Sequence, residues 1–573
     1  MDGNLSFNLV TDPWIKVISK NDYDEKEVSL TELFQNTEDY YQLCGDSKTQ
    51  DLAVLRFLLS ILLSVYTRFN ADDEKYEWLK LDDKWRVAEI DEDYDDSNKL
   101  NKALFKTWKQ LYKQEAFSNK VIEYLNKYKD RFDLFGDTPF YQVSREVYDQ
   151  NVDAKKQVVK GKGTVAVKQI NRRISESNNT PSIFSPKSEE EKNKTNFAEL
   201  TRWLITYQNF SGVTDKTKVS SKEKFSVSKG WLYSISPVFI KGNDLFETLM
   251  FNLTLTDDQN EKLAVLKQKP VWEYDDINEY IQHRLTASFP DNLSELFTLW
   301  SRILHIEWDR DTPTIFTAGL PKINSEKVFL EPMTIWRRNK DKSESPATKN
   351  KNNLDTAMWR NFGQYIPSMR EGNKNDETRT PGVVDWLLKL KKERAIPKHR
   401  IINLVSVAMV SDGNATSQAP YAEVVDNMEA QAGVLFDDNT EFAKRWPERI
   451  ESTVIDTQKV ATYFYWFAKE FSELRGVKDN NWANKATVRF YDELNIPFYS
   501  WLSSIKVDDD RDKKISEWRK VLNQIVAQQA KEIFALSASA EIIGKEIDKS
   551  EQNIFTIYNK LKRNIYVYFK SRK

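Results

Sequence analysis

The chain has 573 residues, of which 85 are basic and 87 acidic, so its formal net charge is only −2. This balance excludes a general electrostatic attraction to nucleic acid, and any nucleic-acid surface has to be a local patch. Hydrophobic residues make up 40% of the chain and include 17 Trp, 24 Tyr and 31 Phe, which is enough for a packed core and excludes wholesale disorder.

Cysteine and histidine are too scarce for most of the sites that they usually form. The chain has one cysteine, Cys44, and three histidines that lie far apart in sequence. Neither a disulfide nor a four-ligand zinc site is expected from these residues, whereas carboxylate-only metal sites stay open. The first residues lack a signal-peptide pattern, and the longest apolar run, residues 52–65, is shorter than a membrane span. We therefore expect a cytoplasmic protein with no membrane partner and no cofactor.

The first part of the chain predicts strands followed by helices. Residues 5–35 have the pattern of two or three short strands around an Asp-Pro turn. Residues 50–69 predict an apolar helix, in which Arg56 interrupts the apolar run. Residues 99–131 have a helical period, and residues 133–142 form a turn cluster that leads into an aromatic strand start.

The middle of the chain is less regular. Residues 150–230 are rich in Lys, Ser, Thr and Asn and contain one predicted helix near 195–207. Long irregular segments in a compact protein are usually functional or disordered. Residues 231–340 mix strands and helices, and residues 401–428 predict a β-hairpin whose turn contains Asp-Gly-Asn at 412–414.

From about residue 438 the pattern is helical to the end. The helix candidates are 438–449, 453–474, 483–503, 512–540 and 550–569. Pro497 should kink or break the third of these. Long helices joined by short polar loops predict an antiparallel four-helix bundle. The predicted fold class is α+β, with a mixed α/β domain at residues 1–437 and the bundle at residues 438–573.

Five segments carry a family resemblance, and they occur in the family's order. They are residues 5–17 (Leu-Ser-Phe-Asn-Leu-Val-Thr-Asp-Pro-Trp-Ile-Lys-Val), 137–142 (Asp-Thr-Pro-Phe-Tyr-Gln), 204–213 (Leu-Ile-Thr-Tyr-Gln-Asn-Phe-Ser-Gly-Val), 329–337 (Phe-Leu-Glu-Pro-Met-Thr-Ile-Trp-Arg) and 409–419 (Met-Val-Ser-Asp-Gly-Asn-Ala-Thr-Ser-Gln-Ala). In these segments the chain resembles the CasA family, the large subunit of the type I-E CRISPR surveillance complex Cascade. A C-terminal four-helix bundle is also a property of that family.

The resemblance implies DNA surveillance rather than chemistry. In the family, the subunit lies beside the 5′ handle of the CRISPR RNA and reads the protospacer-adjacent motif (PAM) of double-stranded target DNA. It then helps to open the duplex for guide RNA pairing and recruits the helicase–nuclease. The implied partners are CRISPR RNA, double-stranded target DNA, the other Cascade subunits and the helicase–nuclease effector.

The resemblance also implies where the PAM would be read. Gly212 would let the backbone approach the minor groove closely, and the plain alternative is a turn glycine. Lys322 would enter the narrow groove, with Lys327 as the competing choice. The alternative for either residue is an ordinary surface lysine.

The tip of the predicted hairpin is the second implied contact. Gln418 would act as a wedge under the PAM, where it could hydrogen-bond to the separated bases. Asn414 and Ser417 could assist it. The alternative is an exposed turn with no role.

Two basic segments, 155–173 and 216–229, suit phosphate tracking, which positions nucleic acid without reading its sequence. The candidate residues are Lys160, Lys162, Lys168, Arg172, Arg173, Lys216, Lys218, Lys222 and Lys224. A solvated flexible loop is the alternative for each segment. Phe184 lies in a segment that resembles the family loop docked against the RNA handle and its neighbouring subunit, where it would be the anchor.

The sequence lacks a Walker-type phosphate loop, a His-Glu-x-x-His motif and a nucleophile elbow, so we do not expect an enzyme. Two alternatives stay open. One is a metal-dependent nuclease that uses scattered carboxylates, which Mg²⁺-dependent cleavage by the lone protein would reveal. The other is a scaffold subunit without DNA contact, which unchanged target binding by Gln418→Ala and Lys322→Ala variants would favour.

Overall fold

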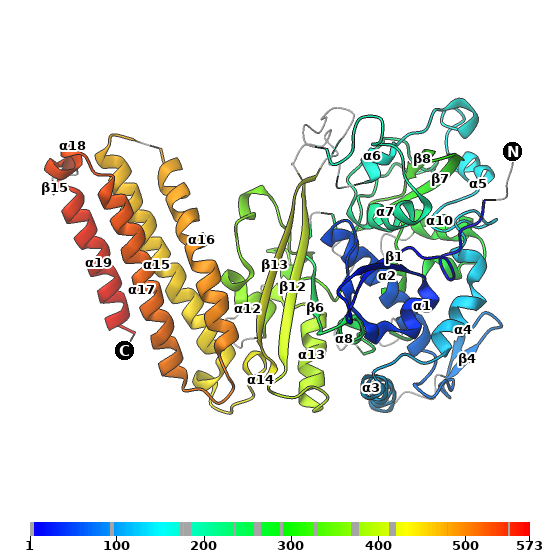
Figure 1. Ribbon diagram of the computed structural model, residues 1–573, viewed down its shortest axis with the longest axis horizontal. Coiled ribbons are helices and arrows are strands. Elements are labelled where there is room, and N and C mark those ends of the chain that lie inside the picture. Colours follow the sequence, from blue (N-terminus) through cyan, green and yellow to red (C-terminus); the bar gives the residue numbers. More distant parts are fainter. Residues whose placement is uncertain are drawn as a thin grey trace. The chain divides into compact units, whose positions relative to one another are not determined.

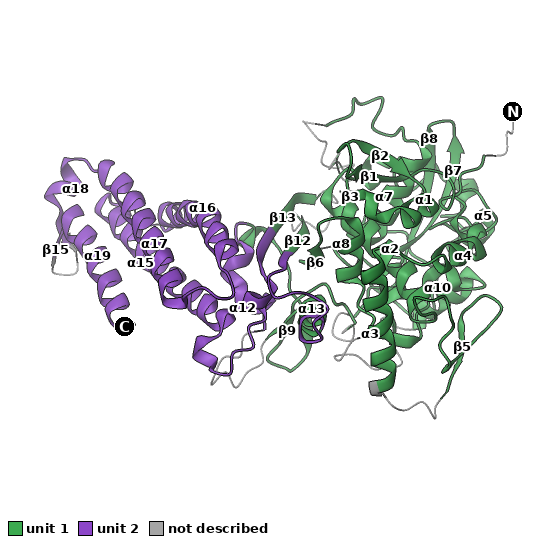
Figure 2. Ribbon diagram, turned by 60° about the horizontal axis from the view of Figure 1, so that its bottom comes forward, with its two compact units in different colours: residues 1–354, 375–389, 404–426 green, residues 355–374, 390–403, 427–573 purple. Residues whose placement is uncertain are grey.

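The structure is a computed structural model, and it divides into two compact units (Figures 1 and 2). Unit 1 consists of Met1–Leu354, Asn375–Lys389 and Leu404–Asp426, and unit 2 of Asp355–Lys374, Leu390–Asn403 and Asn427–Lys573. The residues that the structure describes are 5–91, 97–171, 173, 176, 185–233, 235–256, 265–286, 290–324, 330–367, 378–411, 420–477, 479–547 and 550–572.

Unit 1 is built around the buried helix α2 (Lys48–Tyr66) (Figure 1). The Ser47 side chain caps this helix by accepting a hydrogen bond from the Gln50 amide, and Asp51 lies in the first turn. By length and composition α2 could cross a membrane, but 94% of its apolar window is buried inside the protein, so it is a core helix. Phe57 of α2 is the centre of an aromatic cluster with Trp14, Phe132, Phe140, Tyr141 and Trp272.

Short elements surround α2. Strand β1 (Ile15–Ser19) pairs antiparallel with β2 (Glu25–Val28) and with β3 (Tyr40–Leu43). Strand β4 (Leu79–Leu81) pairs with β5 (Val87–Ile90). The helices of this part are α1 (Leu30–Gln35), α3 (Ser97–Gln114), α4 (Lys120–Lys127), α5 (Arg145–Gln150), α6 (Val167–Ile170), α7 (Phe197–Phe210), α8 (Leu245–Asn252), α10 (Ile277–Thr286) and α11 (Leu293–Phe297). Helices α4, α7, α8 and α11 contact α2.

Three further strand arrangements follow along the chain. Strand β7 (Arg302–Asp309) pairs along its whole length with β8 (Thr312–Gly319). Strand β12 (Ile401–Ser411) lies between β13 (Pro420–Gln431) and β6 (Val238–Lys241). Strand β9 (Trp336–Arg338) lies between β10 (Glu344–Pro346) and β11 (Thr378–Arg379), and helix α13 (Gly382–Lys392) follows.

Unit 2 contains the long C-terminal helices α15 (Trp446–Leu474), α16 (Asn481–Ser504), α17 (Arg511–Ala535) and α19 (Ile554–Lys570). Helix α15 contacts α16, α17 and α19, and an aromatic core that includes Phe464, Phe490 and Trp518 fills the space between the helices. Shorter elements of this unit are α12 (Phe362–Tyr365), α14 (Ala432–Leu435), α18 (Ser539–Ile543) and the β14 (Lys545–Ile547)–β15 (Ser550–Gln552) hairpin. The predicted α+β class, with a helical C-terminal region, is confirmed.

Several predictions about single elements were wrong. The two helices expected at 438–449 and 453–474 are one helix, α15, which begins at Trp446 because Pro447 suits the first helical turn. Of the kink or break that Pro497 predicts, only the break is wrong, because α16 continues to Ser504. The strand expected to start in 133–142 is a series of turns, and only Asp133 forms a bridge, with Asn8, among the residues described there. Residues 30–35 are helical rather than extended because Ser29 caps α1.

Candidate nucleic-acid interface

The structure brings Lys322 next to the second basic segment. We define the basic loop as residues 211–230, which connect the end of α7 to Trp231. The Lys322 amide donates a hydrogen bond of 2.8 Å to the Ser226 carbonyl, and Val227 forms a bridge with Pro321. Lys218 forms a further bridge with Gly319 at the end of β8. Segments about 100 residues apart in the printed sequence therefore form one continuous surface.

Two buried side chains fix the start of the basic loop. The guanidinium of Arg302, which is fully buried on β7, donates hydrogen bonds to the carbonyls of Asp215 (3.0 Å) and Thr217 (3.1 Å). The Gln208 side chain of α7 accepts from the Ser301 amide at 2.7 Å and donates to the Arg302 carbonyl at 2.9 Å. The loop therefore leaves α7 along a defined path.

The end of the loop is fixed by a close backbone approach. The Gly230 amide donates to the Ser211 carbonyl at 2.9 Å, so the loop closes on itself. A Cβ atom at Gly230 would lie only 2.3 Å from the Asn209 carbonyl oxygen, which leaves no room for any other residue. The next residue, Trp231, donates its indole N–H to Glu331 at 2.7 Å.

Glu331 connects this end of the basic loop to the core of unit 1 through hydrogen bonds. Its carboxylate accepts hydrogen bonds of 2.8 Å from Nη1 and Nη2 of Arg56, and both side chains of this ion pair are fully buried. The Met333 amide donates to the same carboxylate at 2.9 Å. The arginine that interrupts the apolar run of α2 is thus a partner of the 329–337 segment.

The lysines of this surface are accessible to a ligand. The residues Lys216, Lys218, Lys222, Lys224 and Lys322 are all exposed. The Lys218 ammonium donates to the Phe225 carbonyl at 3.1 Å, whereas within the described residues no carboxylate pairs with the other four. Gly212, in contrast, is buried at the start of the loop, beside the hydrogen bond between Tyr207 and Thr214.

The first basic segment reaches the same strand, β8. The Thr164 amide donates to the Ile315 carbonyl at 2.8 Å, and Val165 forms a bridge with Ile315. Lys160 and Lys162 are exposed next to this contact. The segment thus lies along β8, the strand whose end carries the basic loop.

Two other residues of this segment already have acidic partners. Lys168 donates to Glu176 at 2.8 Å, so this candidate is engaged within the chain. Arg173 lies 3.7 Å from Asp46. The candidates Arg172, Phe184, Lys327, Asn414, Ser417 and Gln418 lie outside the residues that the structure describes.

The arms of the predicted hairpin, β12 and β13, are confirmed. Glu423 on β13 fixes the outer arm: its carboxylate accepts hydrogen bonds from the amides of Lys48 (3.2 Å) and Thr49 (2.9 Å) at the start of α2. A carboxylate is favoured there because the first amides of a helix lack partners and carry partial positive charge. No pattern in the sequence predicted this contact.

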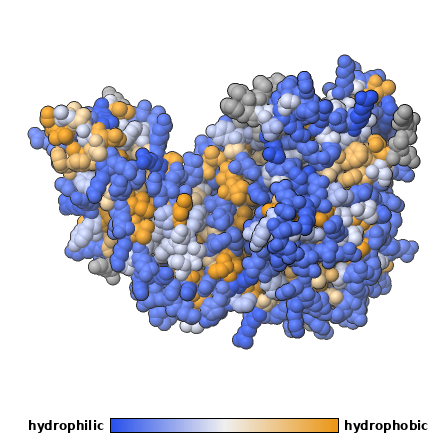
Figure 3. Space-filling model, viewed as in Figure 1, coloured by the Kyte–Doolittle hydropathy of each residue, from blue (hydrophilic) through white to orange (hydrophobic). Residues whose placement is uncertain are grey.

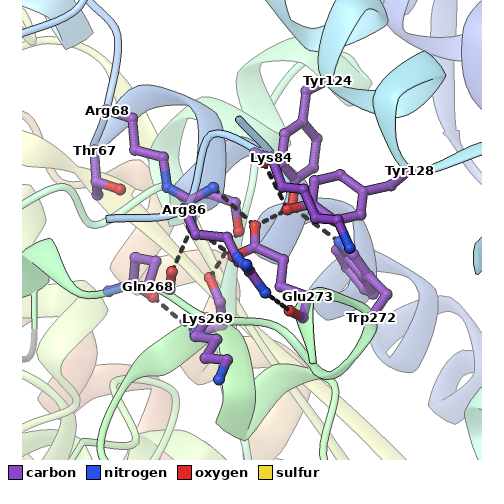
Figure 4. A network of polar contacts seen from close by, with 12 residues as sticks. Thr67, Arg68, Lys84, Arg86, Tyr124, Tyr128, Gln268, Lys269, Trp272 and Glu273 are labelled. Atoms are coloured by element: carbon purple, nitrogen blue, oxygen red, sulfur yellow. Dashed lines mark hydrogen bonds and ion pairs between the residues drawn. The ribbon is translucent and has the colours of Figure 1, made fainter. Parts of the chain in front are cut away.

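A second polar cluster, drawn in Figure 4, is structural. The buried Arg68 pairs with Glu273 at 2.8 and 2.9 Å, and Tyr124 donates its hydroxyl to the same carboxylate at 2.6 Å. Burial raises the pKa of the Tyr124 hydroxyl well above its usual value. Trp272 donates its indole N–H to the Tyr124 hydroxyl, which completes a hydrogen-bonded network.

A cavity of about 620 Å³ lies beside this cluster. Its lining carries both signs of charge and includes Lys84, Arg131, Asp130, Asp137 and Asp275. Among the described residues, no group of three or more His, Cys, Asp or Glu side chains could hold a metal ion.

The Asp508-Asp509-Asp510 run serves the start of α17. Asp510 caps the helix by accepting from the Lys513 amide at 2.8 Å, and Asp509 accepts from the Lys506 amide.

On the face drawn in Figure 3, hydrophilic residues make up most of the surface and hydrophobic residues form separate patches.

The fold and this surface define a two-unit α+β protein that ends in long helices and presents a rigidly anchored lysine-rich loop. Residues 8–529 match the family model described as CRISPR-associated protein Cse1. The chain therefore belongs to the Cse1 family.

Relatives and solved structures agree with this assignment. The CRISPR-associated protein CasA/Cse1 of Thermus thermophilus is 22% identical over 372 residues, and the match spans 64% of this chain and only 61% of that relative. The crystal structure of Thermobifida fusca Cse1 is similar with a TM-score of 0.72 at 20% identity, over 99% of this chain and 98% of that one. A chain of a structure named "CRISPR RNA-guided surveillance complex" is similar with a TM-score of 0.67 at 13% identity, over 98% of this chain and 99% of that one.

Proposed function

We propose that this chain is the large subunit of a type I-E CRISPR surveillance complex, and that it reads the PAM of double-stranded target DNA. Membership of the Cse1 family supports the proposal, as does the similarity to a chain of an RNA-guided surveillance complex. The partners would be CRISPR RNA, the other subunits, the target duplex and the helicase–nuclease effector. The protein would act in the cytoplasm, without catalysis of its own.

The observation that carries the DNA contact is the position of Lys322. Its backbone is hydrogen-bonded to the basic loop, and its side chain is exposed, as are those of Lys218, Lys222 and Lys224 in that loop. A lysine held this way can enter the minor groove, where the phosphate potential is concentrated, while the loop lysines contact phosphates on either side. Such a minor-groove reader distinguishes A·T from G·C only coarsely, so we expect tolerant PAM reading.

The remaining steps rest on the family resemblance. Gln418, with Asn414 and Ser417, would wedge the duplex open from the hairpin tip. Phe184 would anchor the chain to the RNA handle, and Lys327 stays the competing groove residue. The domain division at 437/438 also remains a proposal.

The test is target binding by the reconstituted complex, with and without this subunit, on duplexes with a matching or a scrambled PAM. We expect tight binding only when both the subunit and the PAM are present. Lys322→Ala should weaken binding to the matching duplex about tenfold, which corresponds to ~1.4 kcal/mol, while Lys340→Ala, an exposed lysine on another loop, should not. Equal binding in all cases would contradict PAM reading and favour the scaffold alternative.

Duplex opening needs a separate readout. Gln418→Ala should reduce the reactivity of PAM-proximal thymines toward permanganate, because the bases stay stacked, and should leave binding to a duplex with a pre-opened bubble unchanged. Equal loss on both substrates would contradict a wedge. Mg²⁺-dependent cleavage of DNA by the isolated chain would instead favour the nuclease alternative.

A further inference from the structure

Helix α3 carries a line of lysines that the proposed PAM site does not use. We define the lysine stripe as Lys99, Lys102, Lys106, Lys109 and Lys113, whose spacing of three and four residues places them on one face of the helix. The helix, Ser97–Gln114, contains no Asp or Glu. Like charges at these spacings destabilise a helix, so the pattern is not one that helix stability alone would favour.

The opposite face of α3 packs into the core of unit 1. Leu100, Leu104, Trp108 and Leu111 are buried, and the Trp108 indole donates to the Met250 carbonyl at 2.8 Å. The helix lies at the outside of unit 1 in both ribbon views (Figures 1 and 2). It is therefore a fixed helix that cannot turn its apolar face toward a lipid surface or into the groove of another protein.

The stripe is exposed along most of its length. Lys102, Lys106 and Lys113 are exposed, and Lys109 lies over the Phe105 ring at 4.7 Å. The nearby acid Asp72 is hydrogen-bonded to Gln110 on the flank of the stripe.

Other acids lie at the two ends. In the sequence, an acidic run over 91–96 precedes the helix and Glu115 follows it. Because the helix rises about 1.5 Å per residue, Lys113 lies roughly 24 Å along the axis from the start of the helix.

We propose that the lysine stripe binds the sugar-phosphate backbone of double-stranded DNA, without reading its sequence. This inference rests on the proposed function, which makes a DNA duplex the polyanion that the protein meets. From Lys102 to Lys113 the exposed part of the stripe is about 17 Å long, which equals the axial rise of about five base pairs. A straight, rigid row of cations suits the fixed phosphate spacing of a duplex.

A single strand fits this surface less well. Single-strand sites pair their cations with aromatic rings on which bases stack. On α3, Phe105 and Trp108 are buried and Tyr112 stacks on Trp108, so their rings serve the core. The stripe therefore offers phosphate contacts alone.

The test uses the full chain with a short DNA duplex that lacks both a PAM and a guide match. Binding would be measured by fluorescence anisotropy between about 50 and 200 mM salt. The variant is Lys102→Gln/Lys106→Gln/Lys113→Gln, and the matched control is Lys102→Arg/Lys106→Arg/Lys113→Arg, which keeps the charge. Thermal unfolding of both variants would check that the fold is intact.

We expect the Gln variant to bind the duplex about tenfold or more weakly at low salt, and its log–log salt slope to fall by about 0.9 for each lost phosphate contact. The Arg variant should behave like the parent chain. Unchanged affinity and slope in the Gln variant, or no duplex binding by the parent chain even at low salt, would overturn the inference. An equal loss on single-stranded DNA would overturn the duplex assignment.

Vesicles of phosphatidylserine and phosphatidylcholine provide the other arm. Vesicle binding that depends on the stripe, with DNA binding unchanged, would assign it to a membrane surface and overturn the inference. Because the duplex in the anisotropy assay contains no PAM, the result for the lysine stripe is independent of the PAM test. A failure of PAM discrimination would leave the stripe result standing, and the reverse also holds.

Discussion

Removal of Arg56 should destabilise unit 1 strongly. Arg56→Met keeps the length of the side chain but leaves the Glu331 carboxylate buried without its cation. Both partners are fully buried and are joined by two hydrogen bonds of 2.8 Å. Breaking such a pair from one side costs about 3–5 kcal/mol, which is a large share of the ~5–15 kcal/mol that stabilises a typical domain.

The opposite change, Glu331→Gln, should cost a similar amount because it leaves the Arg56 charge buried. The double variant should lose less than the sum of the two single variants, by about 1–3 kcal/mol, because neither unpaired charge remains. The free energies would come from urea unfolding followed by circular dichroism and fluorescence. Arg338→Met, at an exposed arginine on β9, is the control and should change stability by less than ~0.5 kcal/mol.

A local readout connects this pair to the basic loop. Glu331 also accepts the Trp231 indole N–H, so Arg56→Met should speed hydrogen exchange at the amides of Gly230 and Leu232. A loss of less than ~1 kcal/mol for Arg56→Met, or strictly additive effects in the double variant, would refute the reasoning. Unchanged exchange at the two amides would refute the connection to the loop.

Two further predictions concern single residues. Gly230→Ala should destabilise unit 1 by about 2–4 kcal/mol and weaken duplex binding, because the alanine Cβ would overlap the Asn209 carbonyl. Duplex binding and unfolding like those of the parent chain would contradict this close approach. His283 lies 3.2 Å from the buried Glu295 carboxylate, which raises the His283 pKa above its ordinary value of 6.5. The pair therefore stabilises the protein fully below pH 6.5, and this contribution is lost as the pH rises through the folded pKa of His283. His283→Asn should therefore lower the unfolding free energy more at about pH 5.5 than at about pH 8.5, and equal losses at both would show that the pair contributes nothing.

Local patterns predicted the regular elements well. The apolar period of α2, the helix at 197–210 and the two arms β12 and β13 follow from side-chain spacing and turn residues. The errors came where a local preference was overridden. Pro497 is tolerated inside α16, and the aromatic residues after Asp133 pack as turns around Phe57.

The candidate interface was predicted only as separate pieces. The lysine density of 216–229 and the resemblance of the Lys322 segment were visible in the sequence, but their backbone pairing through Ser226 was not. Arg302 and Gly230, which fix the loop, carried no signal, since a buried arginine and an ordinary glycine look like many others.

The sequence by itself determined the family, the α+β class and most helix and strand positions, because periodicity, capping and motif order act over short distances. It also placed a charge, Arg56, in the middle of an apolar helix without saying why. Only the tertiary structure decided its partner, Glu331, 275 residues away. A buried charge needs a specific counter-charge, and packing chooses that partner, whereas local propensity does not. The same holds for Lys322, whose place beside the basic loop depends on a strand end meeting a distant loop.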